Sequence, residues 1–282
     1  KLNISYFDFC TELKMTNKKF DLLFGQPKRS PETKLKQFHM DVAASIQKIT
    51  EEIILRICKN IATTTGLENL CLAGGVALNC VVNGILLKKK IFKNIWVQPA
   101  AGDAGGALGA ALSVYYLKFN NKRNNLNTNV MKGSFLGPNF SSKEIKKSLN
   151  NINAIFKEYQ TKEIIEKIST SLNDGKIIGL FNGRMEFGPR ALGARSIIAD
   201  PRNINMQRML NLKIKYRESF RPFAPSILLE DVSEWFELNC ESPYMLFVAN
   251  VLKKHHVRIP KRRRKLFGIE QLNLVRTTIP AI

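Results

Sequence analysis

The sequence has few of the side chains that most often carry nucleophilic or metal chemistry. Its 282 residues include three histidines, His39, His255 and His256, and no H-x-x-x-H segment. No arrangement of a nucleophile with a histidine is recognisable, so we expect solvated or helix-capping roles for all three. The five cysteines include no C-x-x-C pair and are too few for a disulfide framework. We interpret them as buried thiols in a reducing compartment, the cytoplasm.

Long apolar runs are also missing. No run reaches the ~18 residues that a membrane-spanning helix needs. The nearest, residues 104–117, is rich in Gly and Ala and is typical of a packed helix. The first residues lack the apolar stretch of a signal peptide. With 44% hydrophobic and 24% charged residues, the composition predicts a folded protein with no membrane partner.

Acidic side chains are outnumbered, because 44 Lys and Arg face 23 Asp and Glu, which gives a net charge of +21. Nucleic acid is the first partner that such a charge suggests. Eight of the basic residues lie in one stretch, residues 253–265, which we call the basic block. Few aromatic residues interleave it, so we expect weak and nonspecific affinity at most and no natural nucleic-acid partner. The other lysines are scattered and are interpreted as a solvated surface.

The hydrophobic pattern predicts an α/β fold in two parts. Val42, Ile46, Ile49, Ile53 and Ile57 form one face of a helix from residue 40 to Gly66. Strands at 69–73 and 95–98 alternate with helices at 76–88 and 104–117, an order typical of α/β layering.

A polar stretch at 118–133, rich in Asn and Lys, is the best linker in the chain. We therefore predict a first domain at 1–120, a linker at 121–133 and a second, mixed α and β domain at 134–282. In the second domain we expect helices at 142–149, 162–172, 204–212 and 230–238, and strands at 176–181, 197–199, 226–229 and 245–251. Ser141 and Glu144 have the spacing of a capping box at the first of these helices.

Two glycine-rich turns follow the strands of the first domain. Gly74 and Gly75 precede a helix in which Asn79 lies about one turn from the start, a pattern that suits a nucleotide. The alternative is a tight turn with an ordinary polar residue. Asp103 precedes the glycines of the second turn, where it is either a helix N-cap or a metal ligand.

The strongest signal is arginine set among Gly, Pro and Phe. Residues 182–196 contain three arginines, and residues 217–225 contain two more, shortly after Lys213 and Lys215. Guanidinium groups in such a frame suit phosphate or carboxylate oxygens. The alternative is structural pairing with Glu186 and Glu218. The chain has no Walker A pattern, so an ordinary P-loop is excluded.

Four segments resemble the O-carbamoyltransferase family, which includes nodulation-factor, cephem and tobramycin carbamoyltransferases. They are LAGGVALNCVVNG at 72–84, AGDAGGALGAAL at 101–112, NGRMEFGPRALGARSI at 182–197 and FRPFAPSIL at 220–228. The resemblance implies the C-terminal part of a sugar-kinase/actin-like (ASKHA) domain followed by a YrdC-like domain. It also implies a reaction in which ATP and carbamoyl phosphate form carbamoyl adenylate, whose carbamoyl group passes to a hydroxyl of a small acceptor.

The resemblance further implies roles for individual residues. Arg190, Lys215 and Arg221 are expected to bind phosphates and the carbamoyl group, with Arg184 in support. Gly74, Gly75 and Asn79 are expected to face the adenosine part. Asp103 matches a carboxylate that binds Fe(II) or another divalent metal, and Mg²⁺ would accompany ATP.

The chain departs from the family at both ends. The family's metal-binding H-x-x-x-H segment is absent, so we expect an incomplete metal site in a protein truncated at both ends. Two other functions stay open: an enzyme of threonylcarbamoyl-tRNA synthesis, which shares both folds, and a nucleic-acid-binding protein that uses the basic block. The acceptor and the oligomeric state cannot be derived from the sequence.

Overall fold

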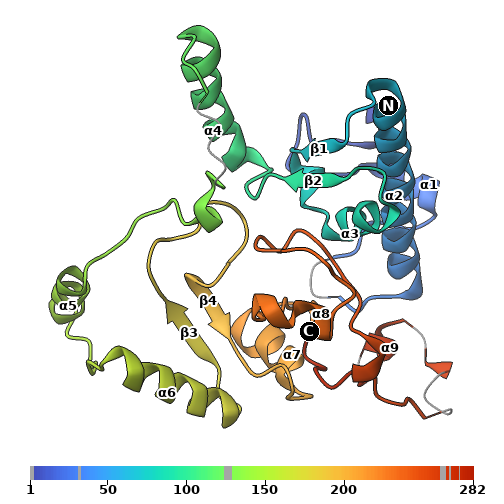
Figure 1. Ribbon diagram of the computed structural model, residues 1–282. Helices are drawn as coiled ribbons and strands as arrows, with labels where there is room; N and C mark the ends of the chain where they lie inside the picture. Colours follow the sequence, from blue (N-terminus) through green and yellow to red (C-terminus); the bar gives the residue numbers. More distant parts are fainter. Residues whose placement is uncertain (1–2, 31–32, 124–128, 261–264, 267, 273) are drawn as a thin grey trace. The chain divides into compact units, whose positions relative to one another are not determined.

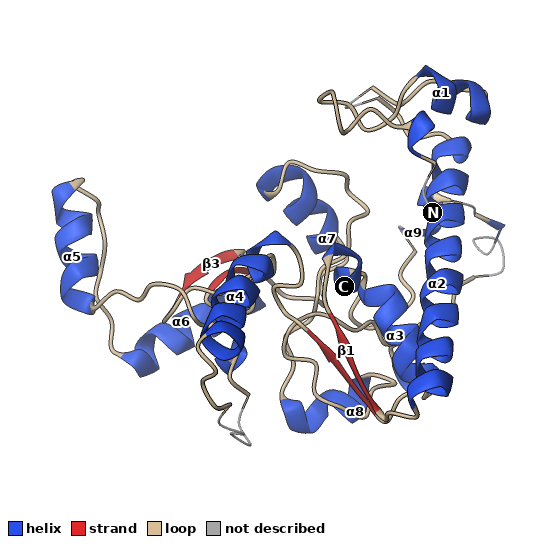
Figure 2. Ribbon diagram, turned by 90° about the horizontal axis from the view of Figure 1, so that it is seen from above, coloured by secondary structure: helices blue, strands red, loops and turns tan. Residues whose placement is uncertain are grey.

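The computed structural model describes residues 3–30, 33–123, 129–260, 265–266, 268–272 and 274–282 (Figure 1). The chain divides into two compact units, Lys1–Gln47 and Lys48–Ile282. The fold is mixed α/β, and in the described residues the strands form two sheets of two strands each. Helices and long loops make up most of the chain, as Figure 2 shows. None of the described helices combines the length and apolar character needed to cross a membrane.

The first unit is organised around Asn17. Its side chain caps α1 (Lys18–Phe24) by accepting the backbone N–H groups of Lys19 and Phe20. The same side chain donates to the carboxylate of Asp8 at 2.9 Å. A short 3-10 turn, η1 (Ile4–Tyr6), precedes this contact. An N-cap of this kind typically contributes ~1 kcal/mol, so one asparagine both starts the helix and anchors the preceding segment.

The long helix α2 (Gln37–Thr65) confirms the predicted helix, but the buried side is not the expected one. Cys58 is buried in a core cluster, and Ile54, Leu55 and Ala62 pack against that cluster. The predicted apolar stripe is largely exposed to solvent, since Ile49, Ile53 and Ile57 are 51%, 51% and 48% exposed. Spacing therefore predicts the helix but does not tell which apolar stripe meets the core.

The second unit contains a parallel pair of strands. β1 (Asn69–Leu72) pairs with β2 (Asn94–Val97), with Leu70 opposite Ile95. Helix α3 (Cys80–Lys89) makes the crossover between them, as parallel pairing requires. Its Val82 and Leu86 are buried with Leu70, which gives the pair a small dry core. α4 (Asp103–Ser113) follows β2 and ends in the π-helical turn η3 (Val114–Lys118).

The remaining elements are an antiparallel pair of strands and several helices, most of them short. β3 (Ile178–Phe181) pairs with β4 (Arg195–Ile198). The predicted capping box at α5 is confirmed, because Ser141 and Glu144 exchange their hydrogen bonds. The bounds of the other helices are α5 (Ser142–Asn151), α6 (Thr161–Asn173), α7 (Met206–Met209) with the π-helical turn η5 (Leu210–Ile214), α8 (Val232–Trp235) and α9 (Ile269–Leu272), and the 3-10 turns are η4 (Lys132–Ser134), η6 (Leu229–Asp231) and η7 (Lys253–His255).

Several predicted elements are wrong or shortened. No strand forms at 226–229 or 245–251 within the described residues. Met245 has a φ of 54°, in the left-handed region that a strand excludes, although Leu246 beside it is buried. The helix expected at 230–238 stops at Trp235, because Phe236 takes an extended conformation and bridges Val251. The domain limits at 120 and 134 stay a prediction, and residues 124–128 of the linker lie outside the described residues.

Candidate active site

A glycine-lined cavity lies where the two parallel strands end. Its volume is about 380 Å³. Parallel strands finish at the same edge of a sheet, so the loops after β1 and β2 meet there. The lining residues are Ala73, Gly74, Gly75, Gln98, Ala100, Ala101, Gly102, Asp103, Gly105 and Gly106. Gly74 and Gly75 belong to the first glycine-rich turn and Asp103 to the second. The sequence predicts these turns as separate features, and the structure brings them together in one cavity.

Backbone contacts hold the two turns against each other. The N–H of Gly74 donates to the carbonyl of Ala101 at 2.8 Å. Gly74 has a φ of 95°, which favours glycine. A Cβ added to Gly105 would overlap the carbonyl oxygen of Ala100, so this glycine allows the close approach of α4 to the loop. Steric fit therefore accounts for two of the glycines independently of any ligand.

Asn79 is placed differently from the prediction. Residues Gly75–Leu78 form a 3-10 turn, and α3 begins only at Cys80. Asn79 is therefore the N-cap of α3, where its side-chain oxygen accepts the N–H of Val82 at 3.2 Å. It does not lie one turn inside the helix, and it is not among the residues that line the described cavity.

The residues present do not fit the implied Fe(II) site. Asp103 is exposed at the first position of α4. Across the described ranges, no group of three or more His, Cys, Asp and Glu side chains could hold a metal ion. The histidines make local contacts instead. His39 accepts the N–H of Lys36 at 3.0 Å, and His255 stacks on Trp235 with its ring centroid 4.0 Å away.

The first arginine loop, residues 182–194, connects β3 to β4 and closes on Glu186. The carboxylate is 7% exposed, and its Oε1 accepts the backbone N–H groups of Leu192, Ala194 and Arg195 at 2.7, 2.8 and 3.2 Å. Burial raises the pKa of this carboxyl, but the backbone hydrogen bonds outweigh burial and hold the pKa below its usual value. Glu186 is thus a buried anion whose partners are backbone groups, and the alternative of Arg–Glu pairing is wrong for it.

Arg195 is also committed to the loop. Its guanidinium donates to the carbonyls of Asn182, Gly183 and Ala194. It also lies over the ring of Phe181, 3.4 Å from the centroid. Planar stacking together with a fork of donors is what arginine does better than lysine. Arg184, in contrast, is exposed on the loop.

Arg190 reaches from this loop to the glycine-rich turn. Its Nη2 donates to the carbonyl of Leu78 at 3.2 Å. Its Nε is buried and has no hydrogen-bond partner in the part of the chain that the structure describes. Gly188 approaches the loop after β2, since a Cβ there would lie 3.2 Å from the carbonyl of Pro99. Ala100, which lines the cavity, is the next neighbour of Gly188, so the Arg190 loop borders the loop that forms the cavity.

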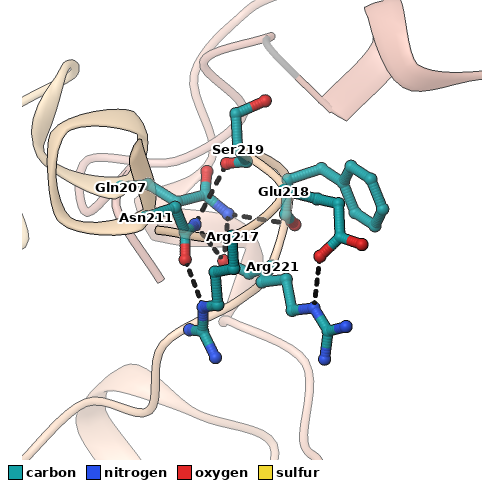
Figure 3. A network of polar contacts seen from close by, with 7 residues as sticks. Gln207, Asn211, Arg217, Glu218, Ser219 and Arg221 are labelled. Atoms are coloured by element: carbon teal, nitrogen blue, oxygen red, sulfur yellow. Dashed lines mark hydrogen bonds and ion pairs between the residues drawn. The ribbon is translucent and has the colours of Figure 1, made fainter. Parts of the chain in front are cut away.

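The second arginine loop, residues 217–221, is organised by Asn211 of η5 (Figure 3). Asn211 is fully buried, and its Nδ2 donates to the carbonyls of Ser219 and Arg221 at 3.1 and 2.8 Å. Its Oδ1 accepts the Nε–H of Arg217 at 2.6 Å. Gln207 of α7 adds a hydrogen bond to the carbonyl of Arg221. Short helical elements thus hold the loop through its carbonyl groups.

Arg217 and Arg221 extend from the same side of this loop, as Figure 3 shows. The Nε of Arg221 pairs with Glu218 at 3.0 Å, so the alternative of Arg–Glu pairing is confirmed here. The guanidinium of Arg217 lies 5.0 Å from the ring centroid of Phe223. Lys215 is exposed just before the loop. Arg190 and Arg221 therefore belong to two separate networks.

Sequence reasoning named Glu186 only as a possible partner of arginine and missed the other residues that brace these loops. The buried polar residues of the described chain are Asn83, Ser134, Glu186 and Asn211. Asn83 donates to the carbonyl of Ala77 at 2.8 Å, and the carbonyl of Ser134 accepts the N–H of Phe187 at 2.7 Å. Each of the four therefore contacts a predicted motif. Their one signal in the sequence is a polar residue within or next to a loop rich in Gly or Arg.

Comparison with known proteins accounts for both halves of the chain. The family model described as "Carbamoyltransferase N-terminus" matches residues 1–112, and "Carbamoyltransferase C-terminus" matches residues 169–264. The glycine-rich turns lie in the first match and both arginine loops in the second. The chain belongs to the carbamoyltransferase family.

Named relatives are consistent with this assignment. The uncharacterized protein sll1178 of Synechocystis is 55% identical over all of this chain and 46% of its own length. Nodulation protein NolO of Bradyrhizobium diazoefficiens is 44% identical over 76% of this chain and 39% of its own length. Nodulation protein NolNO of Sinorhizobium fredii is 41% identical over 76% of this chain and 32% of its own length. The chain thus spans less than half of these relatives.

Proposed function

We propose that the chain forms part of an ATP-dependent O-carbamoyltransferase. In the first step, water cleaves phosphate from carbamoyl phosphate, and the carbamate that forms attacks the α-phosphorus of ATP to give carbamoyl adenylate and pyrophosphate. In the second step, a hydroxyl of a small acceptor takes the carbamoyl group, and AMP and a proton leave. The observation that carries the proposal is the Arg190 loop, which lies within the C-terminal family match and borders the glycine-lined cavity. The corresponding folds are part of an ASKHA-like domain at 1–120 and a YrdC-like domain at 134–282.

The arginine loops suit the first half of this reaction. ATP and carbamoyl phosphate are both anions, so bringing them together requires fixed positive charge that offsets their repulsion. Arg190, Lys215 and Arg221 supply that charge, with Arg184 at the edge of the first loop. Each hydrogen bond to a charged group typically contributes ~1.5–3 kcal/mol.

The glycine-lined cavity suits the nucleotide part. Gly74 and Gly75 leave room for the close approach of adenosine, and Asn79 acts through its hold on the start of α3. Mg²⁺ accompanies ATP. Asp103 would supply one carboxylate to a metal on the acceptor side, but no group of three or more His, Cys, Asp and Glu side chains in the described residues could hold a metal ion, and we derive no step through that metal.

ATP–pyrophosphate exchange, measured with and without carbamoyl phosphate, tests the proposal. We expect exchange only when carbamoyl phosphate is present. Arg190→Ala should lower it by about 10² or more, the usual effect of removing one donor to developing charge. Arg56→Ala, an exposed arginine on α2, is the matched control and should leave exchange unchanged. Exchange that persists without carbamoyl phosphate, or that survives Arg190→Ala, contradicts the proposal.

A further inference from the structure

Glu186 is the only carboxylate that is buried among the described residues, and it lies four residues before Arg190. A buried charge normally requires a charged partner or several hydrogen bonds. In the described part of the chain, Glu186 makes no ion pair, and its partners are the backbone N–H groups of Leu192, Ala194 and Arg195. The carboxylate is thus satisfied without using a guanidinium.

The geometry of these bonds determines the course of the loop. Glu186 comes before Arg190, and the three N–H donors come after it, so their convergence on one oxygen atom closes the chain on both sides of Arg190. Arg195 also holds the first residues of the loop, because its guanidinium donates to the carbonyls of Asn182 and Gly183. Between these anchors, Phe187 and Leu192 pack against the core cluster that contains Ala101. Arg190 is therefore held at the tip of a loop whose base is fixed.

We propose that Glu186 is a positioning residue that holds Arg190 in place to bind substrate phosphate. The inference rests on the proposed function for the role of Arg190. Because Glu186 is occupied by backbone N–H groups, it does not neutralise Arg190, whose charge stays available for an anion. A carboxylate that paired with Arg190 would compete with the phosphate instead. Glu186 itself does not touch substrate.

Pyrophosphate binding, measured by calorimetry in the presence of Mg²⁺, provides a test that does not depend on turnover. The variants are Glu186→Gln, Arg190→Ala and the double variant. Glu186→Gln keeps the size of the side chain and removes its charge. Glu144→Gln is the matched control, because Glu144 also accepts a backbone N–H, that of Ser141 at 2.8 Å, but caps the distant helix α5. Thermal melting of each variant checks that it is folded.

Residues that act in one network give non-additive effects. We expect Glu186→Gln to weaken pyrophosphate binding about tenfold in the parent protein and less than about twofold when Arg190 is already Ala. Equal losses in both backgrounds would mean that Glu186 acts on the fold in general and would overturn the inference. Unchanged binding in the parent background, or a chain that binds no pyrophosphate, would overturn it as well.

Backbone amide exchange gives a second readout. In Glu186→Gln, the amides of Leu192, Ala194 and Arg195 should lose protection, whereas those of β1 should not. Undiminished protection at all three would contradict the inference, since the carboxylate would then not be closing the loop. If binding and protection behave as expected while carbamoyl-phosphate-dependent exchange is absent, the positioning role stands and the proposed function fails.

Discussion

The two arginine loops are braced in opposite ways. The Arg190 loop turns backbone N–H groups inward, and a buried carboxylate, Glu186, accepts them. The Arg217–Arg221 loop turns carbonyl groups inward, and the buried amide of Asn211 donates to them. One brace carries a charge and the other does not. The comparison shows that a loop carrying arginine can be held by a buried side chain that titrates, such as Glu186, or by one that does not, such as Asn211.

The difference has consequences for charge and for pH. A carboxylate held by N–H groups adds a negative charge inside the first loop, and its strength as an acceptor depends on its ionisation. The amide of Asn211 is neutral at all ordinary pH values, so the hydrogen bonds that it makes do not depend on ionisation. The brace of the first loop should therefore be sensitive to acid, and the brace of the second should not.

The largest effect is expected from Asn211→Leu, which removes the neutral brace. It leaves the part-buried carbonyl of Ser219 without its Asn211 donor and the Nε of Arg217 without its acceptor, whereas the carbonyl of Arg221 keeps the hydrogen bond from Gln207. Unsatisfied buried groups cost ~1–3 kcal/mol each, so we expect a loss of about 3 kcal/mol in the free energy of unfolding. Urea unfolding measures it. The control is Asn205→Leu, an exposed asparagine just before α7. A loss no larger than that of the control would show that Asn211 is not a brace.

Next in size is Gly188→Ala, which tests the backbone of the first loop. Gly188 has a φ of 129°, which only glycine adopts easily, and the new Cβ would lie 3.2 Å from the carbonyl of Pro99. Strain of this kind costs ~1–3 kcal/mol. Thermal melting checks the loss. Gly179→Ala in β3, where a Cβ would meet nothing within 4 Å, should be neutral or slightly stabilising. Equal melting temperatures for both variants would contradict the close approach.

Glu186→Gln tests the charged brace through pH. Because the folded pKa of Glu186 lies below its usual value, the stability it contributes is fully present above the ordinary Glu pKa of ~4.3. That stability is lost as the pH falls through the lower folded pKa. Urea unfolding at pH 7 and pH 3 should show a larger difference between parent and variant at pH 7. Asn211→Leu should show the same loss at both values. A Glu186 difference that does not shrink in acid would remove the contrast between the loops.

The smallest effect on stability is expected from Arg221→Gln. The pair with Glu218 is half exposed, and such pairs contribute ~0–1 kcal/mol. The melting temperature should hardly change, whereas carbamoyl-phosphate-dependent exchange should fall by at least about tenfold, because the variant loses the phosphate ligand that we propose. Gln207→Ala, which removes a hydrogen bond to the carbonyl of Arg221, provides a control on the brace alone. A large loss of stability with unchanged exchange would assign Arg221 to the fold and not to the site.

Local signals in the sequence predict much of the secondary structure. The capping box of Ser141 and Glu144 marks the start of α5, and the apolar spacing marks α2. These features succeed because they depend on residues a few positions apart. The strand expected at 245–251 fails because the left-handed Met245 interrupts it while Leu246 is still buried. A buried segment that pairs with no strand can have the same hydrophobic pattern as a true strand, so the pattern alone does not distinguish them.

The sequence by itself determined the family motifs, the positions of the two arginine loops and the presence of two glycine-rich turns after strands. Those conclusions follow from residue types and their spacing. The tertiary structure decided that the two turns meet, because the two strands pair in parallel and end at the same edge. Only the tertiary structure decided what holds the loops, because Asn211, Asn83 and Glu186 act on backbone groups whose direction no residue type reveals. It also decided that Asn79 caps α3 and that Gly105 serves a close contact with Ala100. Hydrogen bonds to the backbone depend on the path of the chain, and that path exists only once the loops have folded.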